Sequence, residues 1–187
     1  IRRFPSFSGI ATELVFEDRI RDHNKCRYYR DFVVLSLDDF ADTNPISLNQ
    51  FCYNKASCPD LLFPEINILA AEDLLFFRMF SNRYKILKSG IITNFVNTHE
   101  NRSVNLISPE LFVYWNVFAT NYFIDNFHVP EKIEKSMRQY VQLVISNVYL
   151  SAKKTKEGSR ELLKVLKYPS TYRKVLFYKA LIKLFIN

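Results

Sequence analysis

The sequence predicts an all-α fold, a multi-helix layered domain with one small β-hairpin at about residues 91–107. Apolar residues make up 48% of the 187 residues, which is enough for a sizeable core. Only three residues are glycine, so few tight turns and strand bulges are expected. The segment from Phe63 to Lys88 has apolar side chains around much of its circumference, as in a helix buried on more than one side. No repeat or linker is visible, so residues 1–187 are expected to form a single helical domain.

The expected helices follow from local start and stop signals and from the spacing of apolar residues. Ser8 and Ser47 are candidate N-caps, Pro64 suits a first helical turn, and Gly90 suits a C-cap. Ser108 precedes a proline and a glutamate, which is a strong N-terminal signal. Helices are therefore expected over Gly9–Arg21, Ser47–Asn54, Phe63–Lys88, Ser108–Asp125, Pro130–Ala152, Ser159–Tyr168 and Ser170–Phe185.

Two segments leave the choice between helix and strand open. Cys26–Leu37 contains a short apolar run, and periodicity does not separate a buried helix turn from a strand there. Ile91–Val96 is β-branched and aromatic, a polar turn follows, and Ser103–Ile107 alternates again. This pattern predicts the small hairpin, with a frayed helix end as the alternative.

No local motif for catalysis or metal binding is found. The three cysteines, Cys26, Cys52 and Cys58, fit reduced thiols better than a disulfide framework. His23 and Cys26 have the spacing of one ligand pair, but no second pair with zinc-site spacing follows. Glycine-rich phosphate loops and nucleophile elbows are absent. We expect no metal, no cofactor and no enzymatic activity, although a cysteine paired in space with a distant histidine stays open.

Composition also bears on where the chain works. Reduced cysteines and the lack of a membrane-spanning apolar run predict a nuclear or cytoplasmic protein without a membrane partner. The chain begins at Ile1 without a methionine, so it is expected to be a fragment, and a DNA-binding domain could precede it.

The positive charge is concentrated in the last third of the chain. From Glu131 onward 13 Lys and Arg face 4 Glu, a balance of +9, whereas the preceding residues carry −2. Such asymmetry is typical of an acidic or nucleic-acid partner surface, and a solvated helix face is the plainer interpretation. Tyr168 and Tyr172 are available to stack on bases. The candidate phosphate contacts are Lys153, Lys154, Lys156, Arg160, Lys164, Lys167, Arg173 and Lys174.

One stretch, Phe63-Pro64-Glu65-Ile66-Asn67-Ile68-Leu69-Ala70-Ala71-Glu72-Asp73, resembles the signature of nuclear receptor ligand-binding domains of the divergent nematode type. Phe63, Pro64, Glu65, Leu69 and Asp73 match that pattern, and the downstream order of hairpin and helices is similar. The resemblance implies a three-layer helical sandwich, a nuclear location, and a role in transcription regulation as a ligand-binding or dimerisation module. The sequence departs from the family at Lys183, which stands where the activation helix carries an acid, so the usual coactivator clamp is not implied.

An apolar ligand would need a cavity between helix layers. The pocket candidates are aromatic or soft side chains at helical spacing, and core packing is the plainer interpretation for them: Phe76, Phe77, Met79, Phe80, Trp115 and Phe118. Two other functions stay open beside the receptor-like module. One is an all-α protein–protein interaction adaptor of unrelated ancestry, acting through a partner or as a homodimer. The other is a nucleic-acid-binding domain that uses the basic C-terminal third.

Overall fold

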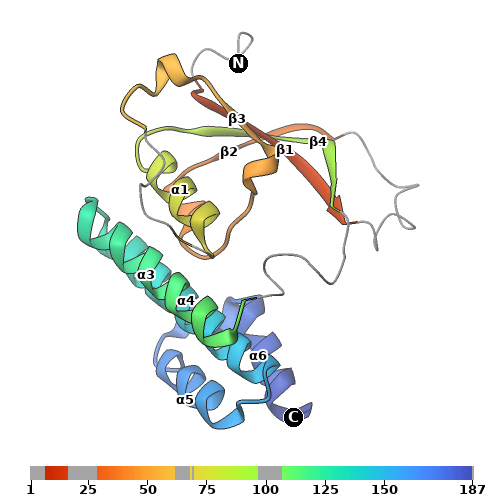
Figure 1. Cartoon of the computed structure of the whole chain (residues 1–187), viewed down its shortest axis with the longest axis vertical. Coiled ribbons are helices and arrows are strands. Elements are labelled where there is room, and N and C mark those ends of the chain that lie inside the picture. Colours follow the sequence, from red (N-terminus) through yellow and green to blue (C-terminus); the bar gives the residue numbers. More distant parts are fainter. Residues whose placement is uncertain (1–6, 17–28, 62–67, 69, 97–106, 187) are drawn as a thin grey trace. The chain divides into compact units, whose positions relative to one another are not determined.

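A computed structural model of the chain describes residues 7–16, 29–61, 68, 70–96 and 107–186. It divides into two compact units, residues 1–67 with 72–106, and residues 68–71 with 107–187. The described residues of the first unit form a small four-stranded sheet and one α-helix, and those of the second form helices (Figure 1). The fold is thus largely helical but mixed, and the expectation of a purely all-α class is corrected. The single domain over residues 1–187 stays a prediction.

The sheet of the first unit is mixed, with strand order β2-β4-β1-β3. The central pair, β1 and β4, is parallel, and the outer strands β3 and β2 pair antiparallel with β1 and β4 respectively. Gly9 lies opposite both Tyr53 and Ile86 in this register. The strands are β1 (Gly9–Phe16), β2 (Tyr29–Leu35), β3 (Phe51–Tyr53) and β4 (Ile86–Val96).

Two longer helices expected in this unit are wrong, and one segment that the sequence left open contains a strand. The expected helix over Gly9–Arg21 is strand β1 in its described part, and the open segment at Cys26–Leu37 contains strand β2. The expected long helix over Phe63–Lys88 is reduced to α1 (Glu72–Ser81), after which the chain turns into β4. Buried apolar residues recur on α1 and again at Ile86 and Leu87 at the start of β4, and the sequence does not show that the chain turns between them at residues 82–85.

The prediction of a hairpin at about residues 91–107 is corrected in its first arm. Ile91–Val96 is extended as expected, but as the second half of β4, which pairs with β1 and β2. Residues 97–106, where the turn and most of the second arm were expected, lie outside the described residues, as does most of the matched stretch before Ile68.

The core of the first unit lies between the sheet and α1 and is densely aromatic. The Phe51 ring on β3 lies edge-on to Phe77 and Phe80 on α1, at centroid distances of 5.1 and 5.0 Å. Short 3-10 turns complete this layer at Leu37–Phe40, Leu48–Gln50 and Lys55–Ser57. Ser47 caps the second of these as expected, because its Oγ accepts from the Asn49 N–H, but that turn is three residues long.

The second unit is built around α4 (Glu131–Ser151), which contacts the other three helices. These are α3 (Pro109–Asn126), α5 (Thr155–Val165) and α6 (Val175–Ile186), and a 3-10 turn at Pro169–Arg173 joins the last two. The starts of α3 and α4 are confirmed. Ser108 Oγ accepts a hydrogen bond from the Leu111 N–H at 3.2 Å, and Pro109 occupies the first helical turn.

Two expected caps in the second unit are wrong. Ser159 lies inside α5, where its Oγ donates to the Thr155 carbonyl oxygen at 2.7 Å. Ser170 lies in the 3-10 turn, and its Oγ donates to Gln139 Oε1 on α4 at 3.0 Å. Serine suits both caps and local helix bonds, so its presence alone does not fix a helix start.

Candidate protein-interaction site

The last helix, α6, is held firmly on one side. Phe177 and Ala180 are buried in a core shared with α4 and α5. Asn147 Nδ2 on α4 donates to the Leu176 carbonyl oxygen at 2.8 Å, and Lys183 Nζ donates to Ser151 Oγ at 2.6 Å. These contacts fix the rotation of α6 about its axis, so one face stays packed and the opposite face stays in solvent.

The solvent face of α6 is apolar. Five large side chains on it have exposed fractions between 52% and 86%: Val175, Tyr178, Ile182, Phe185 and Ile186. Four of them follow the 3-4-3 spacing of residues 175, 178, 182 and 185, which places them in one stripe along a helix. We call these four residues the α6 stripe. Single exposed apolar residues are ordinary, but a continuous stripe marks a contact surface.

The charge next to the α6 stripe is positive. Lys179 is exposed beside the stripe, Lys183 lies one turn further along the same flank of α6, and the helix carries no acidic residue. Burial lowers the pKa of Lys183, and the nearby positive charge of Lys179 lowers it further. Lys183 stands where the receptor pattern has an acid. Through its hydrogen bond to Ser151, the last residue of α4, it holds α6 against α4.

The predicted apolar-pocket residues are distributed over both units. Phe76, Phe77 and Phe80 are fully buried on α1 and fill the aromatic core of the first unit, with Met79 beside them on the same helix. Trp115 and Phe118 lie on α3 in the second unit, with their ring centroids 5.6 Å apart. The candidates on α1 lie together in the first unit, and the two on α3 lie together in the second. That these six residues bind a ligand stays a prediction.

The predicted basic residues lie on several parts of the second unit. Lys154 pairs with Glu110 of α3, and Lys174 Nζ donates to Ser136 Oγ on α4 at 3.3 Å. Lys153 follows α4, and Arg173 ends the 3-10 turn. The remaining four lie on or directly after α5 and are exposed: Lys156, Arg160, Lys164 and Lys167.

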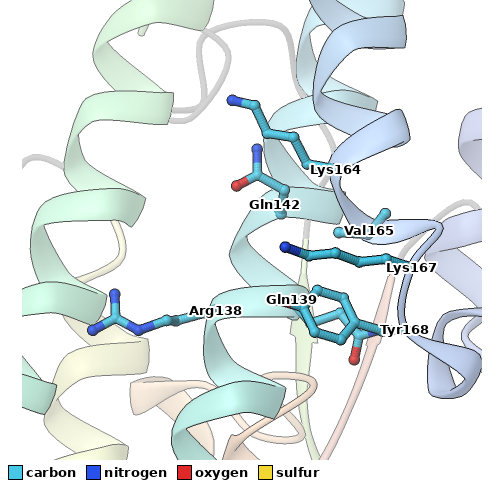
Figure 2. A pocket seen from close by; sticks show the side chains of 7 residues that line it. All are labelled: Arg138, Gln139, Gln142, Lys164, Val165, Lys167 and Tyr168. Carbon is cyan, nitrogen blue, oxygen red and sulfur yellow. The ribbon is translucent and has the colours of Figure 1, made fainter.

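A pocket of about 280 Å³ lies between α4 and the end of α5 (Figure 2). Two of the predicted basic residues, Lys164 and Lys167, line it together with Tyr168. Its other lining residues were not predicted from the sequence, because they lie on α4 and carry no local motif: Arg138, Gln139 and Gln142, with Val165 from α5.

Chemical sites of other kinds are sparse among the described residues. No group of three or more potential metal-ligating side chains is found in the described part of the chain. Cys52 is exposed and Cys58 is buried, and burial raises the pKa of the Cys58 thiol, against a smaller lowering by a hydrogen bond with Ser8. His23 and Cys26 lie outside the described residues. No described helix is both long and apolar enough to cross a lipid bilayer.

The fold and the site together define a small α/β protein with a separate helical unit, and one helix of that unit presents an apolar face to solvent. No family model, curated protein or solved structure matches the chain.

Proposed function

We propose that the chain is a non-enzymatic interaction module that pairs with a second copy of itself through the α6 stripe. The observation that carries this proposal is the continuous exposure of Val175, Tyr178, Ile182 and Phe185 on a helix whose opposite face is firmly packed. Water is a poor solvent for such a surface, and covering it is the main source of association free energy.

The spacing of the α6 stripe favours a second copy as the partner. Positions 175, 178, 182 and 185 are symmetric about residue 180, so two antiparallel copies of α6 that cross there form an isologous contact. Val175 of one copy then lies opposite Phe185 of the other, and Tyr178 lies opposite Ile182. Each contact joins a larger and a smaller side chain, which is the pairing that interdigitates well.

Tyr178 is also suited to this arrangement. Its hydroxyl group donates to the Tyr172 carbonyl oxygen at 2.8 Å, so the polar end of the ring is already satisfied when the rest is covered. Full burial of a Val, Ile or Phe side chain contributes roughly 1.5–3 kcal/mol, against an association cost of about 4–15 kcal/mol. With two stripes buried, a dimer with a dissociation constant in roughly the micromolar range is expected.

The salt dependence of association distinguishes a second copy of the chain from a different partner with an acidic helix. In the antiparallel pair each Lys179 lies one residue from the two-fold axis, so like charges come near one another and added salt should strengthen association. A different partner with an acidic amphipathic helix would instead be attracted by Lys179, and salt should weaken that complex.

A more specific form of the proposal is a dimerisation module of a nuclear-receptor-like transcription regulator, working in the nucleus. Its support is the resemblance of residues 63–73, not the α6 stripe. The strands of the first unit do not follow the three-layer helical sandwich that the resemblance implies. Native mass spectrometry of the purified protein tests the ligand-binding role, since a lipid-sized adduct is expected if an apolar ligand binds.

Sedimentation velocity over a range of protein concentrations tests the pairing. The full chain should pass from monomer to dimer, and Ile182→Glu should stay monomeric because it places a charge in the centre of the stripe. Leu163→Glu is the matched control, since Leu163 is also exposed but lies on α5. Circular dichroism should show both variants folded. A wild-type chain that stays monomeric at all concentrations, or an equal loss in both variants, would refute the proposal.

A further inference from the structure

The pocket between α4 and α5 has a lining that favours an anionic ligand. Three of its seven lining residues are cationic, Arg138, Lys164 and Lys167, and none is acidic. Gln139, a buried residue of α4, also lines the pocket, and its amide is held by Thr171 and Ser170 of the 3-10 turn. The pocket is therefore a preformed concave site with a fixed polar wall.

The cations of this pocket are neutralised to different degrees. Lys164 Nζ is 2.7 Å from both carboxylate oxygens of Glu161, which also accepts from Gln142 Nε2. Arg138 Nε donates to Glu134 Oε1 at 2.8 Å, and its Nη1 donates to Asn121 Oδ1. Lys167 has no carboxylate partner among the described residues, so it supplies the excess positive charge of the pocket.

The pocket also contains an aromatic surface. Tyr168 is partly exposed, and the ammonium group of Lys167 lies 5.2 Å from the centroid of its ring (Figure 2). Tyr168 is 38% exposed and lines the pocket, so part of its ring is accessible to a flat group. A cation and an exposed ring at adjacent positions are the pair of contacts that a nucleotide unit needs, one for phosphate and one for base.

A row of cations leads along α5 to this pocket. Lys156, Arg160 and Lys164 are four residues apart, so they lie on one face of the helix at intervals of about 6 Å. All three are exposed, and Lys167 continues the row by one turn. A row of positive charges that ends at a stacking ring suits a chain of phosphates with unpaired bases better than a single small anion.

We propose that this face of the second unit binds single-stranded nucleic acid. The backbone phosphates lie along Lys156, Arg160 and Lys164, and one base enters the pocket and stacks on Tyr168, with its phosphate on Lys167. This site lies on α4 and α5 and is additional to the pairing through α6. A chain that is dimeric through α6 would carry two such sites.

Fluorescence anisotropy with a labelled oligothymidylate of 12 nucleotides tests the proposal on the full chain. Lys167→Ala and Arg160→Ala should each weaken binding by about tenfold at low salt and make it less dependent on salt concentration. Lys132→Ala is the control for charge, because it removes an exposed lysine at the start of α4, and it should change binding by less than about twofold. An equal weakening by all three variants would mean diffuse attraction to a basic protein and would overturn the proposal.

Stacking is tested separately. Tyr168→Leu should weaken oligothymidylate binding by about tenfold, whereas Tyr168→Phe, which keeps the ring, should bind as the wild type does. A duplex of the same length should bind more weakly than the single strand, because its bases are already stacked. Duplex binding as tight as single-strand binding, or full displacement of the oligonucleotide by an equal concentration of thymidine monophosphate, would overturn the assignment to a single strand.

Discussion

Ser146 Oγ on α4 donates a hydrogen bond to the carbonyl oxygen of Gly158 on α5 at 2.8 Å, in the buried core of the second unit. The two helices approach closely at this bond, and glycine is what permits the approach. A Cβ at residue 158 would lie 2.6 Å from Leu150 Cγ, and Leu150 is itself fully buried. The position of α5, and with it the basic pocket, therefore depends on the absence of one side chain.

Gly158→Ala should lower the free energy of unfolding by about 1–3 kcal/mol, because Leu150 has no free space into which to move. The loss is expected even though alanine favours a helix over glycine by about 1 kcal/mol. Chemical denaturation of the full chain measures it. Ser159→Ala is the control, since the Ser159 hydroxyl donates within its own helix to the Thr155 carbonyl oxygen, and it should be nearly neutral. Unchanged or increased stability of Gly158→Ala would contradict the close approach.

Lys153, which follows α4, is in the left-handed region with φ of 58°. Its N–H donates to the Leu150 carbonyl oxygen, and the next N–H donates to that of Tyr149, a pattern that ends helices and favours glycine. Lys153→Gly should therefore raise the free energy of unfolding by about 0.5–1 kcal/mol. Lys153→Ala, which removes the charge but keeps a Cβ, should not. A gain of the same size in both variants would point to the charge instead of the backbone.

Asp73, on α1, has its pKa raised by burial, and the negative charge of Glu72 raises it further. The Leu48 N–H, 3.3 Å from Asp73 Oδ2, opposes these effects in part. Because the folded pKa exceeds the unfolded one, the contribution of this group to stability is complete below the unfolded value and is lost as pH rises through the folded value. The loss therefore begins near the ordinary value of 3.8 and extends above it.

Asp73→Asn keeps an oxygen that can accept from the Leu48 N–H but does not ionise. Its stability relative to the wild type should therefore increase between about pH 3 and about pH 7, as measured by urea unfolding at each pH. Asp60→Asn, at an exposed position of the same unit, controls for the loss of one charge. A difference between Asp73→Asn and the wild type that stays constant with pH would show that burial does not penalise this carboxylate.

The helices of the second unit could be predicted because their signals are local. The Ser108 cap and Pro109 define the start of α3 within three residues, and Pro130 does the same for α4. The strands of the first unit have no such signal. The partner of β1 is β4, which lies more than 60 residues later in the chain, and this pairing overrides any local preference of the Gly9–Phe16 segment.

The candidate surfaces were predictable only in part. The apolar residues of α6 are visible in the sequence, but which of them stay exposed depends on how α4 and α5 pack against the other side. Arg78 shows most clearly that burial could not be predicted from the sequence, because an arginine in an apolar helix suggests a solvated face. It is instead fully buried, with its Nε donating to the Phe40 carbonyl oxygen at 3.0 Å.

Disulfide trapping between two variants, each with one cysteine introduced on α6, tests the antiparallel pairing of α6 most directly. Val175→Cys and Phe185→Cys are prepared separately in a chain with Cys26 and Cys52 replaced by serine, and are then mixed under mild oxidation. The α6 pairing predicts a linked dimer in the mixture and little in either variant alone, because residue 175 of one copy lies opposite residue 185 of the other. Equal linkage of each variant with itself, or no linkage in the mixture, would contradict it.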